Sequence, residues 1–169
     1  RDTASSHERL FFVEVMGHTA GYLALNSAIA TGSEAAIIPE MDTEVDQLAE
    51  LISQGFRKSK NSAIVIVAEN PRTGGAMGLA ERVKKEFPQY DARVTILGHI
   101  QRGGSPTAQD RILASRMGSY AVSLLLEGHG GRCVGVSGNK LVHHDIVECL
   151  ETMKHPFNQE LFDINQRMF

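Results

Sequence analysis

Short apolar runs alternate with longer amphipathic stretches along most of the chain. Residues 62–68 form the clearest run and are apolar at almost every position, which is typical of a central parallel strand covered by helices. Further strands are predicted at residues 10–15, 35–38, 93–97, 132–136 and 140–143, and helices at residues 21–30, 42–56, 76–87, 108–127, 145–153 and 159–168. This alternation predicts an α/β fold, with a mainly parallel sheet and helices on both faces.

The longest predicted helix, at residues 108–127, has one apolar face. The residues expected to point inward from it are Leu113, Met117, Tyr120, Ala121 and Leu124. After this helix, a turn at Gly138-Asn139 is expected to join the last two predicted strands.

Composition and charge restrict the class of protein. Of the 169 residues, 42% are hydrophobic and 22% are charged, as in folded globular proteins. Lys and Arg number 17 and Asp and Glu number 20, and the net charge of −3 argues against a general nucleic-acid binder. A small anionic ligand is still allowed, because a few arginines can converge locally on it.

The sequence also bears on where the protein resides. No apolar run approaches the roughly 18 residues of a membrane span, so no membrane association is expected. The chain starts at Arg1 without signal-peptide features, and we expect it to lack its natural beginning. Cys133 and Cys149 form neither a C-x-x-C pair nor a disulfide framework, which predicts two reduced, buried thiols in a cytoplasmic protein.

Polar residues and glycines gather where three predicted strands end. Met16-Gly17-His18 follows the first strand, Glu69-Asn70 follows the central one, and residues 98–104 follow the fourth. Because ligands of open α/β sheets bind at the carboxyl ends of the strands, these segments are candidate binding loops. Glu69 could accept hydrogen bonds from sugar hydroxyls, or it could cap a helix or join a surface ion pair.

The loop at residues 98–104 has the chemistry of a phosphate site. His99 and Arg102 can donate to phosphate oxygens, and Gly103-Gly104 would let backbone N–H groups approach an anion. The alternative is an ordinary glycine turn that leaves Arg102 on the surface. The residues alone therefore predict an α/β domain with a phosphate-ester site.

Four stretches carry a family resemblance: RDTASSHER at 1–9, VEVMG at 13–17, LGHIQRGGSP at 97–106 and DRILASR at 110–116. Together they closely resemble the bacterial ATP-dependent 6-phosphofructokinases. The resemblance runs over the whole chain and covers roughly the C-terminal half of such an enzyme. It implies a phosphofructokinase-like fold and the transfer of the γ-phosphoryl group of ATP to fructose 6-phosphate, with Mg²⁺.

The resemblance implies a fructose 6-phosphate site. His99 and Arg102 would meet the 6-phosphate and Glu69 the sugar hydroxyls. At position 18 many relatives have arginine, and His18 would weaken one cationic contact near the transferred phosphoryl group. Arg9 and Arg93 would reach the substrate site of a neighbouring subunit in a homotetramer. The implied substrate-binding residues are Arg9, Met16, Gly17, His18, Glu69, Arg93, His99, Ile100, Gln101 and Arg102.

An allosteric site for ADP or phosphoenolpyruvate is also implied. By spacing alone, the basic residues near position 58 are ordinary cations at a helix end. In the family pattern they match effector-binding positions, with Glu34 as a ligand of the effector's Mg²⁺. The implied effector residues are Arg1, Gly32, Ser33, Glu34, Lys58, Lys60, Asn61 and Ser62.

The resemblance further implies how function divides along the chain. Residues 1–100 would bind fructose 6-phosphate and effector, residues 101–150 would pack with the ATP-binding domain of the full enzyme, and residues 151–169 would return to the first domain. The catalytic aspartate and the ATP-binding loops belong to the other half, so no catalytic residue is assigned and the chain alone is expected to be inactive. The alternatives are a pyrophosphate-dependent relative and a non-catalytic sugar-phosphate sensor.

Overall fold

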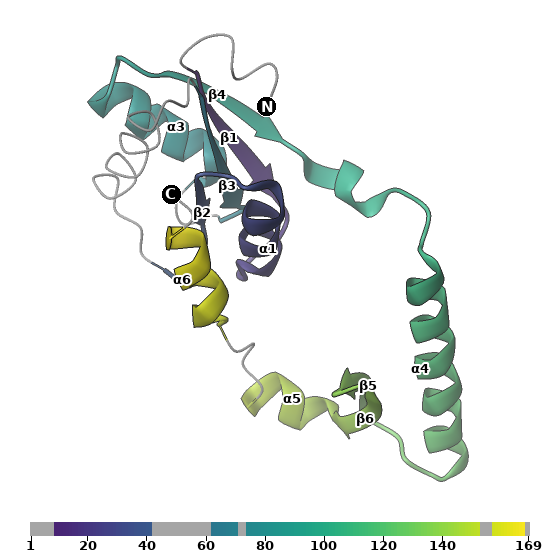
Figure 1. Ribbon diagram of the computed structural model, residues 1–169. Helices are drawn as coiled ribbons and strands as arrows, with labels where there is room; N and C mark the ends of the chain where they lie inside the picture. Colours follow the sequence, from purple (N-terminus) through teal and green to yellow (C-terminus); the bar gives the residue numbers. More distant parts are fainter. Residues whose placement is uncertain (1–8, 42–61, 71–73, 153–156, 168–169) are drawn as a thin grey trace. The chain divides into compact units, whose positions relative to one another are not determined.

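The computed structural model describes residues 9–41, 62–70, 74–152 and 157–167 (Figure 1). The chain divides into two compact units, one formed by Arg1–Gly103 with Phe157–Phe169 and the other by Gly104–Pro156. Among the described residues, no helix combines the length and the apolar character that crossing a membrane requires. The helix predicted at residues 42–56 lies outside the described residues.

A four-stranded parallel sheet forms the centre of the first unit (Figure 1). Its strand order is β2-β3-β1-β4, and the register places Arg9 of β1 between Ser62 of β3 and Asp91 of β4. All four strands run in the same direction, so the sheet has one amino edge and one carboxyl edge. The strands are β1 (Arg9–Val15), β2 (Ala35–Ile37), β3 (Ser62–Ala68) and β4 (Asp91–Ile96).

Helices cover both faces of this sheet, as predicted. On one face, α3 (Gly75–Glu86) packs its buried residues, such as Leu79, against Phe12 and Val65. On the other face, α1 (Tyr22–Thr31) and α6 (Gln159–Arg167) pack against alternate residues of the same strands, such as Ile66. Each fully buried Leu, Val or Phe side chain stabilises the fold by about 1.5–3 kcal/mol relative to exposure.

A long helix and an antiparallel hairpin make up most of the second unit. The hairpin turns at Gly138 and Asn139, where the sequence predicted a turn. Their φ angles of 53° and 66° are typical of a type I′ turn. The hairpin is a separate two-stranded sheet, so these strands do not extend the parallel one. The elements are α4 (Ala108–Leu126), β5 (Arg132–Ser137), β6 (Lys140–Asp145) and α5 (Ile146–Thr152).

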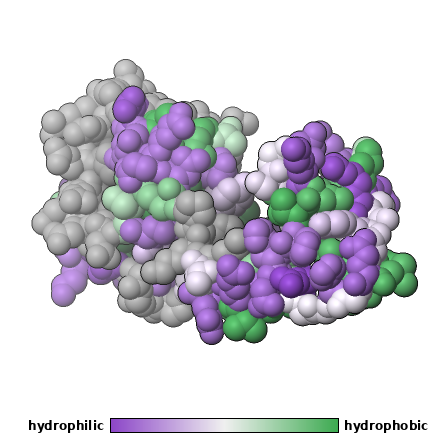
Figure 2. Space-filling model, turned by 90° about the horizontal axis from the view of Figure 1, so that it is seen from below, coloured by the Kyte–Doolittle hydropathy of each residue, from purple (hydrophilic) through white to green (hydrophobic). Residues whose placement is uncertain are grey.

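The apolar face of α4 is only partly covered within its unit. Leu124 is buried, but Leu113 is 40% exposed, so the prediction that Leu113 points inward is wrong. The hairpin strands have six residues each and the helix has 19, so they cannot cover its whole length. On the face seen in Figure 2, hydrophobic side chains reach the surface between hydrophilic ones.

Candidate functional site

Glu69 joins two loops at the carboxyl edge of the sheet. Its backbone N–H donates to the Val15 carbonyl at 2.8 Å, which places it beside the end of β1. Its Oε1 atom accepts hydrogen bonds from the backbone N–H groups of Gly17 at 3.3 Å and His18 at 3.0 Å. The next helix, α3, has its N-cap at Gly74, so Glu69 does not cap that helix.

The loop that Glu69 holds has a constrained backbone. His18 has a φ of 52°, in the left-handed region that non-glycine residues rarely adopt. A Cβ atom on Gly17 would run into the carbonyl oxygen of Ala20. The N–H of Ala20 donates to the Gly17 carbonyl at 2.9 Å, which closes this turn. Gly17 is therefore required by this close approach, and the imidazole of His18 is left exposed on the loop.

Gln101 joins the third loop to the first. Its side-chain oxygen accepts a hydrogen bond from the Met16 N–H at 3.2 Å, and its Nε2 donates to the Gly98 carbonyl at 3.1 Å. Because β1 lies between β3 and β4, the loops after all three strands are tied together through Glu69 and Gln101. Five predicted substrate residues thus share one network: Met16, Gly17, His18, Glu69 and Gln101.

Three further predicted substrate residues, His99, Ile100 and Arg102, lie on a short 3₁₀ helix, η1 (Gly98–Arg102). Three residues per turn place His99 and Arg102 on the same side of η1, and both side chains are exposed. Ile100 is also exposed. The Gly103 N–H donates to the Ile100 carbonyl at 3.2 Å, so this amide is occupied within the turn.

Glu14 supports the site but was not predicted as one of its residues. Its Oε2 accepts a hydrogen bond from the Ala76 N–H at 2.7 Å, at the start of α3, and its carbonyl accepts one from Leu97 at 3.1 Å. Gly75, with a φ of 61°, leaves room for this carboxylate, which a Cβ there would strike. The signal in the sequence is a carboxylate within the apolar run at residues 10–15.

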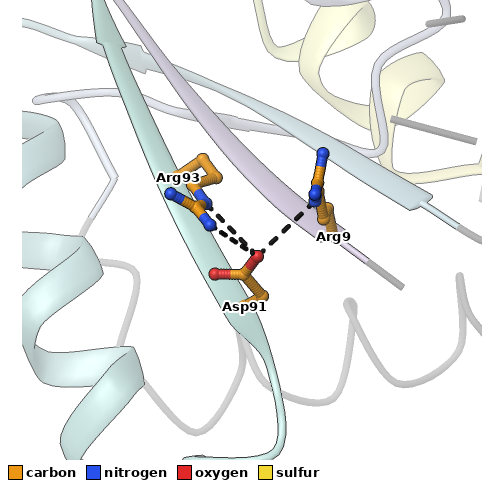
Figure 3. Close-up of polar contacts among 3 residues, drawn as sticks. All are labelled: Arg9, Asp91 and Arg93. Atoms are coloured by element: carbon orange, nitrogen blue, oxygen red, sulfur yellow. Dashed lines mark hydrogen bonds and ion pairs between the residues drawn. The ribbon is translucent and has the colours of Figure 1, made fainter. Parts of the chain in front are cut away.

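At the amino edge of the sheet, Asp91 lies between Arg9 and Arg93 (Figure 3). One carboxylate oxygen, Oδ2, accepts hydrogen bonds from Arg93 Nε at 3.2 Å and Nη2 at 3.1 Å, and lies 3.5 Å from Arg9 Nε. The atom of Arg9 nearest to Asp91 is Nε, so the carboxylate of Asp91 lies beside the guanidinium of Arg9. Exposed ion pairs of this kind contribute only about 0.2–1 kcal/mol each, but here they keep two like charges together.

The two sets of predicted substrate residues lie at opposite edges of the sheet. Arg9 begins β1 and Arg93 lies near the start of β4, whereas Glu69 and the η1 residues follow strand ends. At about 3.3 Å per residue, the seven residues of β1 separate the edges by roughly 20 Å. One copy of the chain therefore presents two separate groups of cations.

The described effector residues also lie at the amino side of the sheet. Gly32 ends α1 in the left-handed conformation, and Ser33 and Glu34 follow it, both buried. Glu34 donates its N–H to the Ile64 carbonyl at 2.9 Å, and its Oε2 accepts from the Ile64 N–H at 2.6 Å. Ser62 begins β3. Arg1, Lys58, Lys60 and Asn61 lie outside the described residues.

Comparison with known proteins decides the family. A family model described as Phosphofructokinase matches residues 1–125. The chain belongs to the phosphofructokinase family. It is 60% identical over 164 residues to ATP-dependent 6-phosphofructokinase 2 of Bacteroides thetaiotaomicron, covering 97% of this chain and 50% of that protein. It is 50% identical over 169 residues to the ATP-dependent 6-phosphofructokinase of Tolumonas auensis, covering 100% of this chain and 52% of that protein.

Solved structures of phosphofructokinases share the fold, which confirms the predicted fold class. The Saccharomyces cerevisiae phosphofructokinase matches with a TM-score of 0.75 and 37% identity, over 89% of this chain and 21% of that one. A pyrophosphate-dependent phosphofructokinase from Marinobacter aquaeolei matches with a TM-score of 0.76 over 96% of this chain and 48% of that one, and at 20% identity shows the fold alone. The chain spans about half the length of the curated relatives it matches.

Proposed function

We propose that this chain supplies the substrate- and effector-binding half of an ATP-dependent 6-phosphofructokinase, which phosphorylates fructose 6-phosphate in glycolysis. The observation that carries the proposal is the network through Glu69 and Gln101, with the exposed His99 and Arg102 beside it. The names of the relatives at 60% and 50% identity favour ATP over pyrophosphate as the phosphoryl donor. The protein is cytoplasmic.

In this proposal the chain binds and orients the sugar phosphate. Arg102 and His99 donate charge-assisted hydrogen bonds to the 6-phosphate. The Glu69 carboxylate has about four lone-pair positions, and those left by the two backbone N–H groups accept hydrogen bonds from sugar hydroxyls. The other half of the enzyme supplies the catalytic base and the site for ATP with its Mg²⁺, so the chain alone is inactive.

A second copy completes the site. Arg9 and Arg93, kept together by Asp91 at the amino edge, contact the substrate of a neighbouring subunit in a homotetramer. The separation of the two edges by roughly 20 Å supports this assignment, because one copy does not bring both groups of cations to one sugar phosphate.

The effector site, for ADP or phosphoenolpyruvate, lies at the amino side as well, next to Gly32–Glu34. An effector there could move the arginine pair and thereby change the neighbour's affinity for substrate. The described residues contain no group of three His, Cys, Asp or Glu side chains that could hold a metal ion. In this proposal, Mg²⁺ at Glu34 also takes oxygen ligands from the effector.

A hybrid enzyme tests the proposed function. This chain replaces the matching half of the Bacteroides thetaiotaomicron relative, and production of fructose 1,6-bisphosphate is measured with ATP and with pyrophosphate. We expect activity that requires ATP and fructose 6-phosphate and disappears in the Arg102→Ala hybrid. The donor itself is tested in the full-length protein that contains this chain, where activity with pyrophosphate and not with ATP would support a pyrophosphate-dependent enzyme. A well-folded hybrid that binds fructose 6-phosphate without turnover would support a non-catalytic sensor.

A further inference from the structure

The two cysteines of the chain, 16 residues apart in the sequence, meet in the second unit. The sulfur of Cys133 on β5 lies 3.1 Å from the sulfur of Cys149 on α5. Both side chains are half-buried, so the prediction of two buried thiols is wrong. We propose that Cys133 and Cys149 are an oxidation site, which forms a reversible intramolecular disulfide and locks α5 onto the β5–β6 hairpin.

The backbone of the second unit builds this contact. Cys133 lies opposite His144 in the antiparallel register of β5 and β6. The next residue, Asp145, caps α5, because its Oδ1 accepts hydrogen bonds from Val147 at 2.9 Å and Glu148 at 3.3 Å. Cys149 follows Asp145 by one helical turn and so lies on the same side of the helix.

A further hydrogen bond fixes the start of α5 against β5. The N–H of Ile146, the first residue of α5, donates to the carbonyl of Gly131 at 3.0 Å, just before β5 begins. The β5–β6 pairing therefore positions Cys133, and the hydrogen bond from Ile146 to Gly131 positions the helix that carries Cys149. The two sulfurs need to approach by only about 1 Å to reach the disulfide bond length of about 2.05 Å.

The reaction is thiol–disulfide exchange with a small-molecule disulfide such as oxidised glutathione. The Cys133 thiolate attacks one sulfur of that disulfide, forms a mixed disulfide and releases one glutathione thiolate. Cys149, after losing its proton, attacks the Cys133 sulfur, forms the intramolecular bond and releases the second glutathione. The protein loses two hydrogen atoms, and the oxidised glutathione gains them as two thiols.

The surroundings of Cys149 favour this order of attack. The hydrogen bond with Cys133 raises the pKa of Cys149 to about 11, and burial and the nearby charges of Cys133, Glu148 and Asp145 act in the same direction. Cys149 is therefore a protonated thiol near neutral pH, and we assign the first attack to Cys133. Once Cys133 is a mixed disulfide, its hydrogen bond and charge no longer raise the pKa of Cys149.

The test uses the purified, reduced 169-residue chain with excess oxidised glutathione at neutral pH. Intact-mass analysis should show the loss of two hydrogen atoms without a stable glutathione adduct, and peptide mapping should identify a Cys133–Cys149 link that dithiothreitol reverses. The chain has no other cysteine, so the free-thiol count should fall to zero. A product that keeps one or two glutathiones, or a disulfide-linked dimer in its place, would overturn the proposal.

Matched variants and a denatured control show whether the folded structure promotes formation of the disulfide. Cys149→Ser should accumulate the mixed disulfide at Cys133, and neither Cys149→Ser nor Cys133→Ser should form an intramolecular link. In the folded chain the link should form at least about tenfold faster than in concentrated urea, because the fold raises the local concentration of one thiol around the other. Equal rates in the two conditions would show that the fold does not promote the link.

Discussion

The Glu69 carboxylate accepts a hydrogen bond of 3.0 Å from the backbone N–H of His18, and so the end of β3 fixes the loop that follows β1. The left-handed backbone of His18 is held in this way by a residue 51 positions away in the sequence. The same side chain is the one that we assign to the sugar hydroxyls. Glu69 orders this loop, and in the proposed function it also binds the sugar.

Replacing Glu69 tests this double role in the hybrid enzyme. Glu69→Ala removes the sugar contact and the loop anchor together, and we expect the KM for fructose 6-phosphate to rise at least about tenfold, equivalent to about 1.4 kcal/mol. Glu69→Gln keeps an oxygen acceptor for the loop and should have a smaller effect. Glu86→Gln, an exposed charge at the end of α3, is the control and should leave the KM unchanged. An unaltered KM for fructose 6-phosphate in Glu69→Ala would contradict the assignment.

The phosphate assignment predicts a selective loss of substrate affinity. Hydrogen bonds to charged groups contribute about 1.5–3 kcal/mol, so Arg102→Ala should raise the KM for fructose 6-phosphate by roughly ten- to a hundredfold. His99→Ala, on the same side of η1, should act in the same direction and less strongly. The KM for ATP, measured in the same variants, should change far less. Equal changes in both constants would remove these residues from the phosphate site.

The proposed sharing of sites between subunits predicts complementation. Arg93→Ala and Glu69→Ala hybrids should each have low activity at limiting fructose 6-phosphate. After the two are mixed, dissociated and reassembled, some sites would combine an intact Glu69 with an intact Arg93 from the neighbour. Activity should then exceed the mean of the two parents. If every mixture only averages the parents, the arginine acts within its own subunit.

The first unit could be predicted closely because its signal is local. Every position of β3 is apolar or small, and the strand has the predicted bounds, Ser62–Ala68. The contact between Gln101 and Met16 could not be predicted in this way. The two residues are 85 positions apart, and their meeting depends on β1 lying beside β4, which periodicity does not specify.

Less of the second unit could be predicted from the sequence. The helical spacing around Leu113 correctly predicted a helix, but a pattern of apolar residues does not say whether a partner covers them. The contact between Cys133 and Cys149 was missed for a related reason. To predict that contact, both the register of the hairpin and the first residue of α5 must be known, and the pattern of apolar residues gives neither.

The cap of α4 predicts how the second unit responds to acid. Thr107 and Asp110 form a capping box, in which Asp110 Oδ2 accepts hydrogen bonds from the Thr107 N–H at 2.8 Å and the Thr107 hydroxyl at 2.7 Å. These hydrogen bonds lower the pKa of Asp110 below its usual value of 3.8. The folded carboxylate thus has the lower pKa, so its stabilisation is complete well above pH 3.8 and is lost as the pH falls through the folded pKa.

We therefore expect Asp110→Asn to lower the helix content and the melting temperature of the chain at pH 7, and to flatten its acid response below pH 3.8. Far-ultraviolet circular dichroism, recorded from pH 7 to pH 2 in both proteins, measures this difference. Glu86→Gln, an exposed charge at the end of α3, controls for the loss of a negative charge. If the two variants titrate alike, the capping box does not stabilise α4.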